Sequence, residues 1–374
     1  MSPRRLHQVA LPRELALLAG APRKGSRDAR RATEHLDELA RLADTAGAAV
    51  AGRVVQLVSS PDPHFYIGKG KVEEVRSRVA AAGATMLIFD EELSPSQGRH
   101  LEEALGVRVM DRTELILDIF ALRARSHEAR TQVELAQLQY LVSRLTRMWV
   151  HLSRIRGGIG LRGPGETQLE TDRRAIRHRI GRLKKDLAQV TEHRARTRAR
   201  SRERDVLRVA LVGYTNAGKS SLLRALTRAE AHVEDRLFAT LDTLSRETVL
   251  AGTRVRFTDT VGFIRKLPHD LVASFRATLE EALDADVLLH VVDAAHAAWE
   301  DQARVVDAAL EEAGVSGERR VVVALNKADR LGDEERADRL ASARDRGWEA
   351  LLVSATTRDG LEELSRGLTS AATS

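Results

Sequence analysis

The chain has 374 residues, of which 43% are hydrophobic, and this length is enough for two or three domains with buried cores. It has no cysteine, which excludes disulfides and thiolate metal sites. We find no apolar run near the roughly 20 residues that span a bilayer, and no apolar segment of signal-peptide length. We therefore expect a cytoplasmic protein without a membrane span.

The positive charge is concentrated in one part of the chain. The net charge is +6, but residues 144–204 contain 18 Lys and Arg against 6 Asp and Glu, whereas the remaining residues contain 42 against 48. A local excess of this size indicates a surface that binds a polyanion. The alternative is an ordinary solvated helix that is rich in arginine.

The first part of the chain predicts a small α/β layer. Residues 1–48 are basic and rich in Ala and Pro, with a helical pattern around Arg30 to Ala43, and we expect about the first thirty residues to be mobile. Residues 49–111 alternate between strand and helix patterns, which predicts a parallel sheet. The basic loop Phe65–Lys71 within it is either an anion site or a plain surface turn. The strands are predicted at Gly52–Ser59, Thr85–Phe89 and Val107–Met110, and the helices at Gly70–Ala82 and from the cap Ser94 to Leu105.

Residues 112–204 predict two long helices. There is no Gly or Pro from Arg112 to Arg156, and a second helical stretch begins near Glu166. Apolar residues three and four apart mark one face of each helix, which favours an antiparallel hairpin. The alternative is two helices folded flat onto a globular domain, but the charges on the other faces favour a projecting hairpin. The apolar positions are Leu138, Leu141, Leu145, Met148 and Leu152 in the first helix, and Ile176, Ile180, Leu183, Leu187 and Val190 in the second.

The segment between the two helices, residues 154–166, contains five glycines, a proline and three arginines. Glycine lets the backbone approach a partner closely, and arginine binds phosphates or stacks on bases. We expect this tip to contact RNA, although a flexible hinge would have a similar composition. The predicted RNA contacts are Arg154, Arg156, Gly157, Gly158, Arg162, Arg173 and Arg174.

From residue 205 to 374 strands and helices alternate again, which predicts a doubly wound α/β nucleotide-binding domain. Its first strand, Val206–Val212, leads into Gly213–Ser220, which reads G-x-x-x-x-G-K-S before a helix. In such a phosphate loop (P-loop) the backbone N–H groups and the helix start bind phosphates, and Lys219 adds a positive charge. The other strands are predicted at Arg254–Thr258, Val287–Val292, Val321–Leu325 and Leu351–Val353.

Two segments after the P-loop have the pattern of GTPase switches. The first switch, Phe238–Asp242, supplies Thr240 for Mg²⁺, with Thr243 as second choice. The second switch starts with Asp259-Thr-Val-Gly262, in which Asp259 would reach Mg²⁺ through water and the Gly262 N–H would contact the γ-phosphate.

Two further motifs select the base. Asn326-Lys-Ala-Asp329 follows a strand, and the Asp329 carboxylate can accept two hydrogen bonds from guanine that adenine cannot offer. Lys327 would cover the base, and the Ala355 N–H in Ser354–Ala355 could donate to the guanine oxygen. Because all these motifs occur in order at the ends of strands, we predict a GTP-binding domain.

The predicted site therefore comprises three groups of residues. Lys219, Thr240 and Gly262 are the predicted catalytic residues, and Ser220, Thr240 and Asp259 (through water) are the predicted Mg²⁺ ligands. The predicted nucleotide contacts are Gly213, Tyr214, Thr215, Asn216, Ala217, Gly218, Lys219 and Ser220; Phe238, Ala239, Thr240, Leu241 and Asp242; Asp259, Thr260, Val261 and Gly262; and Asn326, Lys327, Ala328, Asp329, Ser354, Ala355 and Thr356.

The residue after the second switch motif bears on the rate of hydrolysis. Regulatory GTPases commonly place a glutamine there to orient the attacking water, but this chain has Phe263. We expect slow intrinsic hydrolysis that accelerates when a partner orders the two switches.

By these motifs and their order, the chain resembles the HflX-type GTPases from about Arg53 onward. The resemblance rests on Gly157–Arg174, Asp259–His269, Asp111–Phe120 and Tyr66–Lys71. It implies that the N-terminal domain binds the large ribosomal subunit and that the tip probes ribosomal RNA. It also implies that the ribosome stimulates GTP hydrolysis and that the protein splits stalled ribosomes. We expect a monomer, with no further domain after the last nucleotide motif.

The sequence departs from the family pattern at two points. Thr243 and Leu244 stand where the family usually has Pro and a second Thr, which affects the detail of the first switch, and Leu161 replaces a threonine of the tip. Two other functions stay open: a signalling GTPase whose hairpin binds a protein, and an RNA-remodelling enzyme that also uses ATP. The basic hairpin and Asp329, respectively, favour the ribosomal GTPase over these alternatives.

Overall fold

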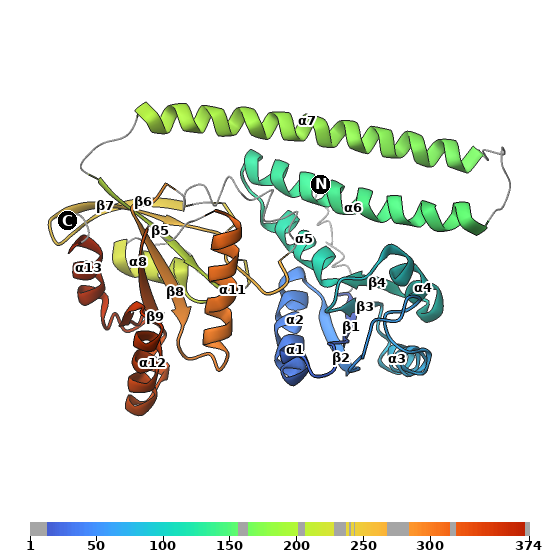
Figure 1. The fold of residues 1–374 in the computed structure, drawn as a ribbon, viewed down its shortest axis with the longest axis horizontal. Coiled ribbons are helices and arrows are strands. Elements are labelled where there is room, and N and C mark those ends of the chain that lie inside the picture. Colours follow the sequence, from blue (N-terminus) through green and yellow to red (C-terminus); the bar gives the residue numbers. More distant parts are fainter. Residues whose placement is uncertain are drawn as a thin grey trace, which may run out of the picture. The chain divides into compact units, whose positions relative to one another are not determined.

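The computed structural model describes residues 13–155, 164–200, 206–227, 237–238, 241–242, 244–267, 284–314 and 319–370. By its contacts the chain divides into two compact units. The first unit comprises residues 1–119 and 143–159, and the second comprises residues 120–142 and 160–374 (Figure 1).

The first unit is built on a four-stranded, fully parallel sheet with the strand order β2-β1-β3-β4. One face packs against α3 and α4, whose buried Val75, Val79 and Leu101 contact Leu87 and Phe89 of β3. The helix α4 begins with a capping box, in which Ser94 and Gln97 satisfy each other's backbone N–H groups. The elements are β1 (Leu15–Gly20), α1 (Arg27–Arg30), α2 (Ala32–Ala46), β2 (Ala49–Val55), α3 (Lys69–Ala82), β3 (Met86–Phe89), α4 (Pro95–Leu105) and β4 (Arg108–Asp111).

The central position of β1 corrects one expectation. We expected Leu15–Gly20 to be among the mobile residues, but this segment pairs with both β2 and β3 and is almost fully buried. Its composition, Leu-Ala-Leu-Leu-Ala-Gly, has a low strand propensity. Burial on both faces, as is usual in a parallel sheet, outweighs that propensity.

The long helical stretch is divided into two helices, α5 (Arg112–Arg123) and α6 (His127–Ile155). The prediction of one unbroken helix is therefore wrong at residues 124–126. Ser126 occupies the N-cap position of α6, and its Oγ accepts a hydrogen bond from the Ala129 N–H at 3.0 Å. Within the first unit, Arg144 of α6 forms ion pairs with Asp111 and Glu114.

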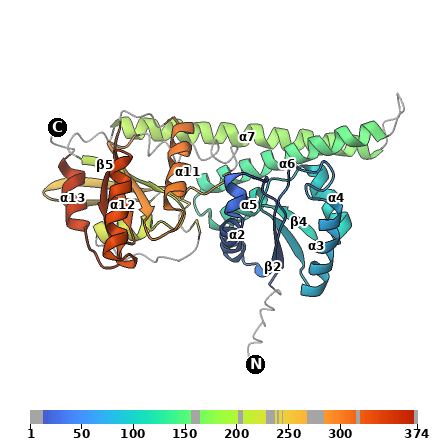
Figure 2. The same ribbon diagram turned by 60° about the horizontal axis from the view of Figure 1, so that its bottom comes forward.

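The helix α7 (Pro164–Arg200) runs antiparallel to α6 and lies alongside its first half (Figures 1 and 2). Arg179 of α7 makes a two-pronged ion pair with Glu134 of α6, at 2.8 and 3.0 Å. The apolar stripe predicted for α7 is buried at Leu183 and half-buried at Ile176, Ile180, Leu187 and Val190. In α6, by contrast, Leu141 of the predicted stripe is exposed.

The second unit contains a six-stranded sheet with the strand order β10-β9-β8-β5-β7-β6. All pairs are parallel except β6 with β7, and this antiparallel edge strand was not predicted. The other five strands confirm the predicted doubly wound domain. The elements are β5 (Val206–Gly213), α8 (Lys219–Thr227), β6 (Leu244–Leu250), β7 (Thr253–Asp259), β8 (Val287–Asp293), α11 (Trp299–Glu312), β9 (Arg320–Asn326), η1 (Ala328–Arg330), α12 (Asp333–Asp345), β10 (Glu349–Leu352) and α13 (Leu361–Thr369).

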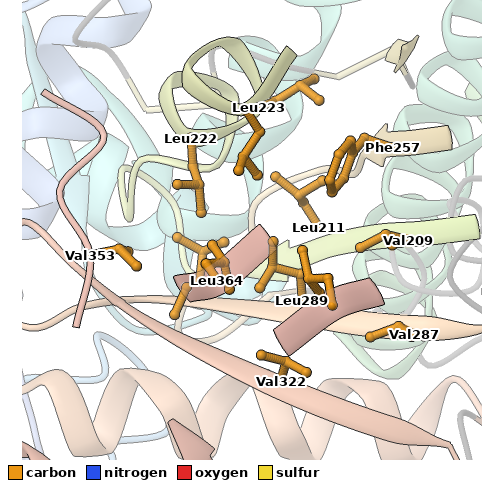
Figure 3. Packing of buried hydrophobic residues seen from close by; sticks show 14 of the residues in the cluster. Val209, Leu211, Leu222, Leu223, Phe257, Val287, Leu289, Val322, Val353 and Leu364 are labelled. Carbon is orange, nitrogen blue, oxygen red and sulfur yellow. The ribbon is translucent and has the colours of Figure 1, made fainter. Parts of the chain in front are cut away.

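Helices cover both faces of this sheet. On one face α8 and α13 pack on the strands, and Figure 3 shows Leu222, Leu223 and Leu364 against Leu211 and Leu289. On the other face α11 and α12 pack around Trp299 and Leu325. Because both faces are buried, the central strands are mostly apolar, with His290 in the middle of β8 as a buried exception.

Candidate nucleotide-binding site

The predicted nucleotide motifs lie at the carboxyl ends of neighbouring parallel strands. The P-loop follows β5, the second switch follows β7, and the Asn326–Asp329 motif follows β9. In open α/β sheets this edge is where ligands bind. The fold therefore brings together motifs that are more than a hundred residues apart in the sequence.

The P-loop requires glycine at both ends. A Cβ at Gly213 would lie 2.2 Å from the Val291 carbonyl oxygen, and one at Gly218 would lie 2.3 Å from the Asn326 Nδ2. Gly218 also has a φ of +95°, which L-residues rarely adopt. Asn216 between them has a φ of 61°. The loop is thus curled tightly, and α8 begins directly after it at Lys219.

Lys219 lies inside this loop. Its Nζ donates hydrogen bonds to the Gly213 and Tyr214 carbonyl oxygens, both at 3.0 Å. Burial lowers the pKa of Lys219 to about 8, although the Asp259 carboxylate acts in the opposite direction. The Lys219 ammonium group is thus buried and bound to two carbonyl oxygens, which phosphate oxygens could replace as hydrogen-bond acceptors.

Ser220 and Asp259, two of the predicted Mg²⁺ ligands, are paired with each other beside the loop. The Ser220 Oγ donates to the Asp259 Oδ2 at 2.6 Å, and Asp259 is buried. Hard oxygen donors of this kind suit Mg²⁺, which usually keeps several waters and binds one or two protein groups together with substrate phosphates. The described residues contain no cluster of three or more His, Cys, Asp or Glu that could hold a metal by themselves.

The second switch is attached to the P-loop by its backbone. The Thr215 N–H donates to the Phe263 carbonyl at 2.7 Å, and the Phe263 N–H donates to the Gly213 carbonyl at 3.1 Å. The Phe263 side chain is only 3% exposed. A Cβ at Gly262 would meet the Lys219 Nζ at 3.1 Å. The position where other GTPases have glutamine is therefore occupied by a buried apolar ring.

The residues predicted to recognise the base are connected to the P-loop. The Asn326 Nδ2 donates to the Ala217 carbonyl at 2.9 Å, and its Oδ1 accepts from the Ala355 N–H at 3.1 Å. The Ser354 Oγ donates to the Asp329 Oδ1 at 2.6 Å, which orients that carboxylate. Ala328 and Thr356 flank these residues in η1 and after β10.

Two interactions of this network were not predicted from the sequence. Asp293, at the end of β8, forms an ion pair with Lys327 at 2.7 Å, and Lys327 also donates to the Asn216 carbonyl. Tyr214 accepts a hydrogen bond from the Arg265 N–H at its hydroxyl, at 2.9 Å. The position of Asp293 at a strand end next to a predicted motif was the available signal for the first; nothing in the sequence indicated the second.

The first switch is described at Leu237, Phe238, Leu241 and Asp242; Ala239, Thr240 and Thr243 lie outside the described residues. Both leucines and Phe238 are buried. The Phe238 ring contacts Phe120 of α5, and the Asp242 carboxylate accepts hydrogen bonds from residues 125 and 126. These side chains thus contact the α5–α6 segment.

The predicted RNA contacts are only partly described. Arg156, Gly157, Gly158 and Arg162 lie outside the described residues, and Arg154 lies in the last turn of α6. In α7, Arg174 is exposed and Arg173 is half-buried. Arg177, Arg182, Lys184 and Lys185 are also exposed along α7. Among the described residues, no helix is both long and apolar enough to cross a membrane.

His290 of β8 makes the stability of this domain sensitive to acid. It is 2% exposed, its Nδ1 lies 3.6 Å from Asp307, and burial, together with the Lys219 charge, lowers its pKa to about 4. In the unfolded chain the imidazole protonates near pH 6.5, whereas in the folded protein it stays neutral down to about pH 4. The free energy of unfolding therefore decreases by up to about 3 kcal/mol as the pH falls from 6.5 to 4.

We expect His290→Asn to flatten this pH dependence, as measured by urea unfolding at pH 7.5 and 4.5. His178→Asn is the matched control, because His178 is exposed on α7. Equal losses of stability between the two pH values in wild type and His290→Asn would contradict this account.

Three family profiles match the chain in succession. Residues 33–121 match the N-terminal region of GTP-binding GTPases, residues 123–201 match their middle region, and residues 208–327 match the family described as 50S ribosome-binding GTPase. The third match ends within the Asn326–Asp329 motif, and it covers the P-loop and both switches.

Individual relatives give the same picture. The chain is 52% identical to the GTPase HflX of Caldanaerobacter subterraneus over 80% of this chain and 70% of the relative. It is 47% identical to the GTPase HflX of Escherichia coli over 90% of this chain and 78% of the relative. Among solved structures, the SsGBP–GDP complex is 26% identical with a TM-score of 0.52, and the alignment covers 96% of this chain and 98% of that one.

Proposed function

Because the chain belongs to the HflX family of GTPases, which hydrolyse GTP to GDP and phosphate, we propose that it uses this reaction on the ribosome. In this proposal it binds the large subunit and its RNA through the N-terminal domain (49–111) and the hairpin (112–204), and it remodels or splits stalled ribosomes. The observation that carries the proposal is the guanine motif linked to the P-loop through Asn326 and Lys327. The name of the matching family, 50S ribosome-binding GTPase, supports the choice of partner.

The guanine nucleotide would be held at both ends. The backbone N–H groups of Gly213–Ser220 would bind the phosphates, and Lys219 would exchange its two carbonyl acceptors for phosphate oxygens. The Asp329 carboxylate, oriented by Ser354, would accept the ring N–H and the amine of guanine. A carboxylate that pairs with guanine but not with adenine gives strong discrimination between the two bases, which favours GTP over ATP.

Mg²⁺ fits the site, since Ser220 and Asp259 present a hydroxyl and a carboxylate to the same place. We propose that Ser220 binds the ion directly, that Asp259 binds it through water, and that Thr240 completes the set. When bound, Mg²⁺ would neutralise charge on the phosphates.

The buried Phe263 supports a low intrinsic rate. With no polar side chain at this position, water must be oriented by backbone groups or by an added partner. The proposed contribution of the ribosome is to order both switches so that Thr240 and the Gly262 N–H face the γ-phosphate. Charge stabilisation would then come from Lys219 and the P-loop amides.

Exposed arginines on α7 support RNA as the partner rather than a protein. We expect the protein to sediment with ribosomes in the presence of a slowly hydrolysed GTP analogue and to be released with GDP. Binding should weaken steeply with salt, because phosphate contacts release counterions. Absence of binding to ribosomes, or binding that depends neither on the nucleotide nor on the salt concentration, would contradict the proposal.

A charge-matched pair of variants sharpens this experiment. Arg174→Ala/Arg177→Ala removes two exposed charges from α7, whereas Arg344→Ala/Arg366→Ala removes two from α12 and α13. We expect the first variant to reduce the slope of log affinity against log salt by about 1 for each arginine. The second should bind like wild type, and equal effects of the two pairs would indicate that α7 makes no specific contact.

A further inference from the structure

The first switch is fastened to the hairpin base on both sides of Thr240. We define the hairpin base as Phe120 of α5 together with the turn Ala124–Ser126 that separates α5 from α6. Phe238, two residues before Thr240, packs edge-to-face on Phe120, with ring centroids 4.6 Å apart and an interplanar angle of 87°. Both rings are at most 2% exposed, so this contact is part of the interior.

Asp242, two residues after Thr240, makes the second attachment. Its Oδ2 accepts hydrogen bonds from the Arg125 N–H at 3.0 Å and the Ser126 N–H at 3.2 Å, and its Oδ1 accepts from the Ser126 Oγ. These amides lie just before the first turn of α6, where the helix dipole favours a negative charge. Charge-assisted hydrogen bonds of this kind are stronger than neutral ones.

Ser126 takes part in two separate interactions. Its Oγ caps α6 by accepting from the Ala129 N–H, and the same hydroxyl donates its proton to Asp242. The start of α6 and the position of the first switch thus depend on one side chain. Leu237 and Leu241 are buried beside the two attachments, which limits the ways in which this segment can shift.

We propose that Asp242 is a positioning residue for GTP hydrolysis, acting by clamping the first switch to the hairpin base through Ser126. This rests on the proposed function, in which Thr240 serves the γ-phosphate and Mg²⁺. Two peptide units allow Thr240 at most about 7 Å of chain from either attachment. A movement of the switch on hydrolysis therefore strains the start of α6, and a force on the hairpin acts back on the switch.

The test uses variants that separate the clamp from the helix cap. Ser126→Asp keeps an N-cap acceptor for α6 but places a second carboxylate against Asp242. Asp242→Asn removes the charge that the turn binds. In the double variant the side-chain amide introduced at position 242 can donate to the carboxylate introduced at position 126, so the clamp is restored by an exchanged pair. The matched control is Asp333→Asn, an exposed aspartate in the first turn of α12.

We expect Ser126→Asp to lower the kcat of intrinsic hydrolysis about 10-fold, the size expected for one charge-assisted hydrogen bond, with KM and GDP affinity unchanged. The double variant should recover to within about 3-fold of wild type, and the control should match wild type. Amide exchange in residues 124–131 should accelerate about 10-fold in Ser126→Asp and return in the double variant.

A wild-type kcat in Ser126→Asp, together with faster exchange at residues 124–131, would overturn the proposal. So would a double variant that is as slow as its slower parent. These outcomes are distinct from failure of the proposed function, which would appear as wild-type protein that neither binds GDP nor hydrolyses GTP.

Discussion

Replacing Lys219 with methionine is expected to lower the kcat of GTP hydrolysis by about 10²-fold or more. The charged Nζ lies inside the P-loop, where burial makes an interaction with phosphate oxygens much stronger than in water. Loss of one such stabilising group typically costs about 10²–10³-fold in kcat. The measurement is phosphate release by the purified protein at saturating GTP.

The same substitution is expected to leave the nucleotide-free protein at least as stable as wild type. The pKa of Lys219 falls from 10.5 to about 8, so the folded protein binds this proton less tightly than the unfolded chain. At pH 7 the buried charge costs up to about 3 kcal/mol, and this cost disappears as the pH rises from about 8 to 10.5. Methionine removes the charge at similar length and also the two hydrogen bonds to Gly213 and Tyr214.

Lys24→Met provides the control, since Lys24 is exposed in the first unit. It should change neither kcat nor the unfolding midpoint. Hydrolysis within 5-fold of wild type by Lys219→Met would contradict the assignment of this lysine to the phosphates.

Replacing Asp329 with asparagine is expected to exchange guanine for xanthine specificity. In the proposed site the carboxylate would accept from the ring N–H and the exocyclic amine of guanine, whereas an asparagine amide can donate to the carbonyl that xanthine carries instead of the amine. Ser354 still holds the side chain in place through Oδ1. We expect GTP affinity to fall about 10²-fold or more, since hydrogen bonds to a charged group contribute about 1.5–3 kcal/mol each.

Binding of fluorescent GDP and XDP to the purified variant measures this exchange. Asp338→Asn, an exposed position on α12, is the control and should retain guanine preference. A variant that loses affinity for GDP without gaining affinity for XDP, yet unfolds like wild type, would show that Asp329 stabilises the loop and does not recognise the base.

Most of the nucleotide site could be predicted because its motifs are local. Gly213–Ser220 specifies a loop geometry by residue type alone, and the clashes at Gly213 and Gly218 show why. The strands around it are runs of apolar residues buried on both faces, which are easily recognised. The position of Asp293 at a strand end was a signal, but its ion pair with Lys327 joins residues 34 positions apart, and their proximity depends on the strand order.

Two parts of the backbone were predicted wrongly for a related reason. The strand β1 is made of residues that favour helix, and only its central place between β2 and β3 makes it a strand. The break at residues 124–126 has no Gly or Pro, and the structure has there both the Ser126 cap and the Asp242 carboxylate from a distant segment. The Ser126 cap is a local signal that was overlooked, whereas the contact with Asp242 joins residues 117 positions apart and is not contained in local propensity.

The sequence by itself therefore determined the nucleotide chemistry: a phosphate loop, a carboxylate suited to guanine and a phenylalanine where water would be oriented. Each of these depends on residue identity within a few positions, so it can be recognised without a fold. Only the tertiary structure decided what the first switch touches. From the sequence, Phe238 and Asp242 were predicted to contact the nucleotide. In the structure Phe238 packs on Phe120 in the interior, and Asp242 accepts hydrogen bonds at the start of α6, where the helix dipole favours a negative charge. Both partners lie more than a hundred residues away in the sequence.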